Sequence, residues 1–285
     1  MDGGKALALC ANNDLDLWAF EYEQCPPEMA RHPAFPPLIT IPTTAGTGAE
    51  TESTAMITDT LRKMKWCIWH ADLKPAFAVL DPEITLGLPV KLTAWTGVDA
   101  MVHAIEAYCV PGFNPLCDGL ALEGLRLVGR WLPVAVAEPL NLEARGAMLA
   151  GSCLSGIAFL KGLGLVHAIS HMVGAEYDTQ HGLTNAVVLP AALRHNAPAL
   201  ADKIEPLSQA MGLRDTSFEA FYAHVCAILD QVGIPKTLTD IGVPSDCAAR
   251  IADKALQDSA AGTNACALTA QDIERVIVVA LTKGR

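Results

Sequence analysis

The sequence predicts a chain that begins as mixed α/β structure and continues as an all-helical domain. Short apolar runs bounded by polar, Pro or Gly residues fill the first third, as expected of strands. Beyond about residue 90, apolar residues recur instead at helical spacing. The composition is globular, since 51% of the 285 residues are hydrophobic and 18% are charged. We therefore predict two domains, residues 1–89 and 90–285.

The α/β part is expected to contain one short helix and four short strands. The helix is predicted over residues 1–11. After a Pro-rich passage, the apolar run 38–42 predicts a buried strand. Three further short runs predict the remaining strands, at residues 55–58, 66–69 and 77–80.

Helical periodicity dominates the second part. Gly and Pro residues mark the joins between successive helices, as at residues 111–112, 162–164 and 233–235. The predicted helices cover residues 93–109, 115–136, 142–160, 165–175, 218–232, 247–257 and 270–281.

Charge and hydropathy exclude several classes of protein. The net charge of −11 and the lack of a Lys/Arg cluster argue against nucleic acid as a partner. No apolar run reaches the roughly 18–20 residues of a membrane-spanning helix, and the start of the chain lacks a signal-peptide pattern. We therefore expect a soluble, cytoplasmic protein without a membrane partner. The nine cysteines are scattered and include no Cys-x-x-Cys, which argues against a disulfide framework and a structural zinc cluster.

Acidic and histidine side chains at helical spacing predict a metal site. Asp99 and His103 lie four residues apart on a strong helix pattern, so they share one helix face. His167 and His171 repeat that spacing, and His181 follows. With eight histidines in the chain, chance would give roughly 0.2 His pairs at this spacing. The argument therefore depends on the whole group, because an Asp on a hydrophobic helix must be paired or coordinated.

The types of ligand narrow the choice of metal. One carboxylate with three imidazoles suits Fe(II), Zn(II), Mn or Co. We favour Fe(II), because a metal that prefers five or six ligands keeps a position open for substrate; Zn(II) is the alternative.

A Thr/Gly-rich segment, residues 43–48, follows the first predicted strand. Its glycines would let backbone amides approach a phosphate, and its threonines add hydroxyl groups. Neither Gly-x-Gly-x-x-Gly nor Gly-x-x-x-x-Gly-Lys-Ser/Thr occurs, so the segment alone is a weak indication of nucleotide binding.

Taken together, these segments resemble the iron-containing (group III) alcohol dehydrogenase family, over essentially the whole chain. The motifs that carry the resemblance are Pro42-Thr43-Thr44-Ala45-Gly46-Thr47-Gly48, Asp81-Pro82, Thr96-Gly97-Val98-Asp99-Ala100 with His103, and His167-x3-His171-x2-Gly174-x6-His181-Gly182. The resemblance implies a dehydroquinate synthase-like fold, with a partial Rossmann-like α/β part before an all-α metal-binding domain.

The resemblance also implies roles for individual residues. Asp99, His103, His167 and His181 would bind the metal, and His171 would be a proton relay near the substrate. The cofactor-binding positions would be Asp2, Thr43, Thr44, Thr47, Lys65, Gly87, Leu88 and Leu92.

The chain departs from the family pattern in two places. The family's usual Gly-Ser-Glu-Val-Thr is replaced by Gly48-Ala49-Glu50-Thr51-Glu52, which puts individual cofactor contacts in question. Asp2 and Lys5 match the end of a glycine-rich segment whose glycines would precede Met1. Roughly 100 residues of nucleotide-binding structure would then be absent, and we expect an N-terminally truncated chain.

The resemblance implies reversible hydride transfer between a small alcohol or aldehyde and NAD or NADP. The metal would polarise the substrate oxygen, and a homo-oligomer would be the usual assembly. One alternative is a catalytically impaired fragment that keeps the metal site, and another is a metal that merely joins helices. A lyase of the dehydroquinate synthase type is disfavoured. Such enzymes use a Lys/Arg-rich pocket, whereas the segments around this metal site contain almost no basic residues.

Overall fold

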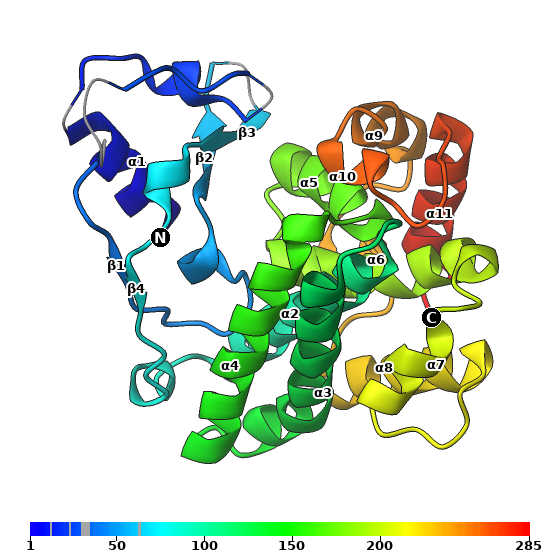
Figure 1. Ribbon diagram of the computed structural model, residues 1–285. Coiled ribbons are helices and arrows are strands. Elements are labelled where there is room, and N and C mark those ends of the chain that lie inside the picture. Colours follow the sequence, from blue (N-terminus) through cyan, green and yellow to red (C-terminus); the bar gives the residue numbers. More distant parts are fainter. Residues whose placement is uncertain (12, 23, 30–34, 62–63) are drawn as a thin grey trace.

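A small α/β part lies beside a larger helical part in the computed structural model (Figure 1). The structure describes residues 1–285 except 12, 23, 30–34 and 62–63, and of residues 64–65 it describes the backbone alone. The predicted fold class is confirmed. The first long helix begins at Val90, and the domain boundary after residue 89 stays a prediction.

The α/β part contains helix α1 (Asp2–Ala11) and two pairs of strands. Strand β2 (Thr54–Asp59) pairs antiparallel with β3 (Met64–Trp69), and α1 packs against β2. Strand β1 (Ile39–Thr40) pairs in parallel with β4 (Phe77–Ala78).

The prediction of a buried strand over residues 38–42 is wrong in one respect. The strand is present, but Ile39 and Ile41 are 63% and 52% exposed, whereas Thr40 between them is buried. Alternate side chains of a strand point to opposite faces, so both isoleucines share an exposed face. The apolar run had suggested burial on both faces.

Ten α-helices form most of the described helical part. Helices α3 and α4 lie side by side and both pack against α2, which also contacts α6 (Figure 1). The helices are α2 (Val90–Cys109), α3 (Pro115–Ala137), α4 (Leu142–Ala158), α5 (Leu165–Tyr177), α6 (His181–Asn196), α7 (Ile204–Ala210), α8 (Phe218–Gln231), α9 (Ala248–Ala255), α10 (Ser259–Gly262) and α11 (Ala270–Thr282).

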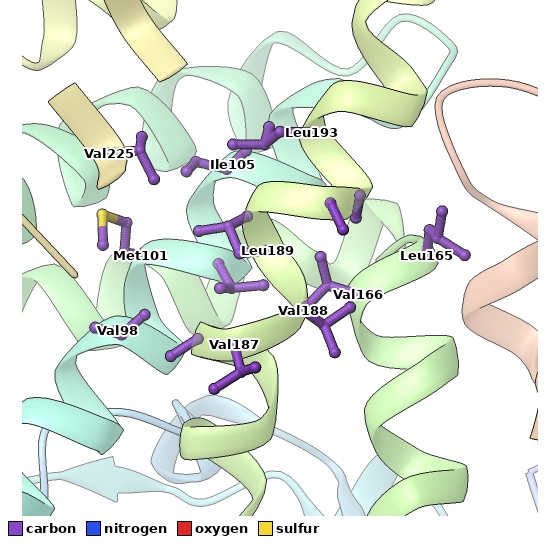
Figure 2. Close-up of a cluster of buried hydrophobic side chains, with 14 of the residues drawn as sticks. Val98, Met101, Ile105, Leu165, Val166, Val187, Val188, Leu189, Leu193 and Val225 are labelled. Atoms are coloured by element: carbon purple, nitrogen blue, oxygen red, sulfur yellow. The ribbon is translucent and has the colours of Figure 1, made fainter. Parts of the chain in front are cut away.

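Buried side chains of α2, α5, α6 and α8 form one part of the core of the helical part (Figure 2). Met101 and Ile105 of α2, Val188 of α6 and Val225 of α8 are all at most 1% exposed. Removing such side chains from water stabilises the fold by roughly 1.5–3 kcal/mol each. The core therefore fixes α2, α5 and α6 relative to one another.

Side-chain caps set several helix starts. Asn114 accepts a hydrogen bond from the amide of Cys117 at the start of α3, and Asn141 does the same for Ala144 in α4. Such caps satisfy amides that have no partner within the helix. The predicted helices are present, with bounds shifted by up to three residues. Helices α6, α7 and α10 were not predicted.

Two expectations about the whole chain can be compared with the structure. All nine cysteines are free. In the described part, no single helix is both long and apolar enough to span a membrane, although the pair Leu142–Lys161 and Leu165–Tyr177, bent by 102°, passes by length and composition.

Candidate metal centre

Three helices bring one carboxylate and three imidazoles together. Asp99 and His103 come from α2, His167 from α5 and His181 from the first turn of α6. Their four donor atoms all lie within 4.8 Å of one another. Asp99 Oδ1 is 3.8 Å, 3.9 Å and 3.6 Å from the Nε2 atoms of His103, His167 and His181 respectively. This group could hold one metal ion.

The link between α5 and α6 places His181 opposite His167. Three residues, 178–180, join the helices, and Asp178 adopts a left-handed conformation with φ of 52°. Non-glycine residues rarely adopt this conformation, and Asp is among the more tolerant. Gln180 then caps α6 by accepting from the amide of Leu183. The tight turn makes His181 the first residue of α6.

Gly182 allows α6 to approach α2 closely. A Cβ atom at this position would lie 2.4 Å from the carbonyl oxygen of Trp95 and 3.1 Å from Cβ of Asp99. Only a glycine therefore lets His181 reach the α2 pair at the observed helix separation.

Contacts with Gly46, Asn185 and Glu106 orient the donor side chains. The Nδ1 atom of His103 lies 3.2 Å from the carbonyl oxygen of Gly46. Because a carbonyl only accepts, Nδ1 carries the proton and the Nε2 lone pair faces the cluster. Asn185 Nδ2 donates to Asp99 Oδ1 at 2.7 Å and also lies 3.2 Å and 3.1 Å from the Nε2 atoms of His167 and His181. His167 Nδ1 lies 2.6 Å from a carboxylate oxygen of Glu106.

Burial keeps the two deepest imidazoles neutral. Loss of solvation lowers the pKa of His103, although the charge of Asp99 opposes the shift. The pKa of His167 is lowered well below its usual value by burial and then by the neighbouring histidines. Neutral imidazoles cannot balance the Asp99 carboxylate, which is 1% exposed. A buried charge needs a partner, and a divalent cation matches both this charge and the lone pairs.

His171 lies beside the cluster and is held by Asp258. Its Nδ1 atom is 2.9 Å from Asp258 Oδ2, and its ring stacks on His181 with centroids 5.5 Å apart. The side chain is 23% exposed, so His171 lies beside the cluster and also contacts solvent.

The Thr/Gly-rich segment reaches the metal centre through Gly46. Thr43 and Thr47 are exposed and Thr44 is half-buried. Thr47 Oγ1 accepts from the amide of Ala49, and Gly48, with φ of 64°, packs directly against Gly156 of α4.

The other predicted cofactor residues occupy three places. Leu88 shares a small cavity with Ala45 of the Thr/Gly-rich segment, while Gly87 is exposed and Leu92 half-buried nearby in sequence. Asp2 lies in the first turn of α1, close to Lys5, whose ammonium group donates to the carbonyl of Ala49. The backbone of Lys65 pairs with Thr58 in the strands, and its side chain lies outside the described part.

The sequence interpretation missed Asn185 and Asp258. Asn185 lies four residues after His181 and therefore on the same helix face, a signal that could have identified it. Asp258 is 87 residues from His171 in the chain, and nothing local marks it. Glu106 lies behind His167, on the side of the ring away from the other donor atoms.

Comparisons with known proteins agree with this fold. The model of the iron-containing alcohol dehydrogenase family matches residues 1–82, and that of the family's C-terminal part matches residues 93–281. The chain superposes on a crystal structure of a 1,3-propanediol oxidoreductase with a TM-score of 0.91 and 34% identity, covering 98% of this chain and 74% of that one. The fold is thus that of the iron-containing alcohol dehydrogenases.

Sequence relatives lead to the same family. The NAD-dependent methanol dehydrogenase of Bacillus methanolicus is 37% identical over 252 residues, which are 86% of this chain and 66% of the relative. The 1,3-propanediol dehydrogenase of Klebsiella pneumoniae is 36% identical over 270 residues, 92% of this chain and 68% of the relative. The chain therefore spans about two thirds of the length of these relatives. It belongs to the iron-containing alcohol dehydrogenase family.

Proposed function

We propose that this chain is a metal-dependent, NAD(P)-linked alcohol dehydrogenase or aldehyde reductase. The observation that carries the proposal is the buried group of one carboxylate and three imidazoles on three helices. Relatives are named as methanol and 1,3-propanediol dehydrogenases. The proposed substrate is accordingly a small alcohol or its aldehyde.

Asp99, His103, His167 and His181 are the proposed ligands of Fe(II), with Zn(II) as the alternative. The bound ion supplies a Lewis acid that polarises an alcohol or aldehyde oxygen. Asp99 contributes the only negative charge among the ligands, and the buried surroundings keep its field strong. His181, the most exposed of the four, lies on the side from which a substrate can enter.

His171 is the proposed proton relay. Asp258 accepts the hydrogen bond from His171 Nδ1, which leaves Nε2 free to exchange a proton. The partial exposure of His171 lets that proton continue to solvent.

The proposed cofactor is NAD or NADP, held along the α/β part. Thr43, Thr44 and Thr47 are assigned to its adenine and phosphate groups, with Asp2 nearby and Lys65 on β3. Gly87, Leu88 and Leu92 precede or begin α2, the helix that carries Asp99. This order would deliver the nicotinamide to the metal centre.

Anaerobic assays of the chain loaded with Fe(II) or Zn(II) test the proposal. We expect reduction of NAD⁺ or NADP⁺ with 1,3-propanediol or methanol, and loss of the rate after the metal is removed with a chelator. Fluorescence titration with NADH and NADPH reports cofactor binding separately. Metal binding without any cofactor binding or turnover would contradict the proposal and support the alternative, a catalytically impaired chain that keeps its metal site.

A further inference from the structure

Glu106 joins two of the helices that carry the proposed ligands. It lies on α2, three residues after His103, and is 6% exposed. Its carboxylate faces the first turn of α5 rather than solvent. Oε1 accepts from the amide of Val166 at 2.7 Å, and Oε2 lies 2.6 Å from Nδ1 of His167.

Glu106 contacts one ring nitrogen of His167 and Asn185 the other, and both contacts bear on which nitrogen carries the proton. An ionised carboxylate only accepts hydrogen bonds, so Nδ1 of a neutral imidazole donates to it. The amide Nδ2 of Asn185 can only donate and lies 3.2 Å from Nε2, which favours the same tautomer. The Nε2 atom then keeps its lone pair, and it faces Asp99 Oδ1 across 3.9 Å. The same contact fixes the rotation of the ring, because the amide of Val166 holds the carboxylate in place from the adjacent residue.

We propose that Glu106 is the positioning residue of the metal centre, which fixes the tautomer and orientation of His167 and thereby ties the α2 ligands to the α5 ligand. The inference rests on the proposed metal centre. Carboxylates behind metal-binding histidines raise metal affinity by about 10- to 100-fold. Glu106 supplies this effect from a helix other than the one that carries His167.

A purely structural role must be separated from this one. Glu106 also satisfies an amide at the start of α5, and a helix cap alone stabilises a protein. Asn264 offers the matched control, because its Oδ1 atom accepts from the neighbouring amide of Leu165 at 3.1 Å. Asn264 serves the same helix end through a different amide, and its other side-chain hydrogen bonds are to Asn196 and Cys266 rather than to His167.

The experiment compares the parent chain with Glu106→Gln and Asn264→Ala. Histidines labelled with ¹⁵N and observed by long-range ¹H–¹⁵N correlation report each tautomer in the metal-free chain at pH 8. Competition with a chromophoric chelator reports Zn(II) affinity, and thermal melting reports stability. We expect the Nδ1–H tautomer for His167 in the parent and in Asn264→Ala. Both oxygens of Glu106 accept a hydrogen bond, one from the Val166 amide and one from Nδ1 of His167. In Glu106→Gln, one of these two atoms becomes an amide nitrogen, which can only donate.

The expected result is that Glu106→Gln lowers Zn(II) affinity by about 10- to 100-fold and changes the signal of His167. Asn264→Ala should lower the melting temperature and leave the affinity within about twofold. Parent-like affinity and tautomer in Glu106→Gln would overturn the proposal. An Nε2–H tautomer of His167 in the parent would overturn it without any variant. If the parent binds no metal, the proposed metal centre fails, while the tautomer still tests Glu106 separately.

Discussion

Replacing Gly182 with Ala tests whether the close approach of α6 to α2 creates the metal centre. The added Cβ would lie 2.4 Å from the carbonyl oxygen of Trp95, whereas ordinary contacts begin near 3.4 Å. The added Cβ is bonded directly to the backbone of α6, and the oxygen of Trp95 belongs to the backbone of α2. The clash therefore cannot be relieved by rotating a side chain. The two helices must therefore separate by about 1 Å at this point.

This displacement is large on the scale of a coordination shell. His181 precedes Gly182, and its Nε2 atom is 3.6 Å from Asp99 Oδ1. Metal sites tolerate changes in bond length of about 0.2 Å. We expect Gly182→Ala to lower metal affinity at least tenfold and to cost about 1–3 kcal/mol of folding stability, as overpacked cores do.

Gly174→Ala is the matched control for this experiment. Gly174 lies in α5, and its added Cβ would meet nothing closer than the carbonyl oxygen of Thr179 at 3.7 Å. Ala within a helix is favoured over Gly by about 0.5–1 kcal/mol, so this variant should be slightly more stable and bind metal normally. Chelator competition and urea unfolding measure both quantities. If Gly182→Ala behaved like Gly174→Ala, the steric argument would be refuted.

Three further predictions concern Glu52, Gly48 and Asp258. Burial raises the pKa of Glu52 from 4.5 to about 7, so the stability that its proton confers is present below pH 4.5 and lost as the pH rises to 7. Glu52→Gln should remove this loss, which is at most about 3 kcal/mol. Melting temperatures that vary with pH in the same way in the parent and in Glu52→Gln, from pH 4 to 8, would contradict this prediction. Gly48→Ala should cost about 1–3 kcal/mol in urea unfolding, because Gly48 has positive φ and its Cβ would lie 2.5 Å from Cα of Gly156; an unchanged midpoint would show that the contact can relax. Asp258→Asn should lower kcat about tenfold or more with little change in metal affinity, because the amide presents a donor to His171 Nδ1; parent-like kcat across pH 6–9 would exclude the relay.

Local spacing was enough to predict much of the candidate site. Asp99 and His103 are one turn apart on a strongly periodic helix, and the structure places both donors at the cluster. The resemblance added His167 and His181 as partners. Spacing alone would have favoured His171 as a ligand, because it follows His167 by four residues as His103 follows Asp99. In the structure, His171 instead contacts Asp258.

The sequence prediction failed where burial was uniform or contacts were distant. Helix α6 is buried on nearly all sides and contains Pro190, so it has no polar face to produce a helical period. The support of His167 by Glu106 and of His171 by Asp258 spans 61 and 87 residues. Such pairs depend on how helices pack and leave no signal in neighbouring residues.

The central claim is that this chain binds one divalent metal ion at Asp99, His103, His167 and His181. Anaerobic titration with Fe(II) or Zn(II) tests it most directly, on the parent and on His181→Ala, with His224→Ala on α8 as the control. The account predicts about one equivalent bound by the parent and by His224→Ala, and none bound tightly by His181→Ala. Equal binding by all three folded proteins, or no binding by the folded parent, would contradict it.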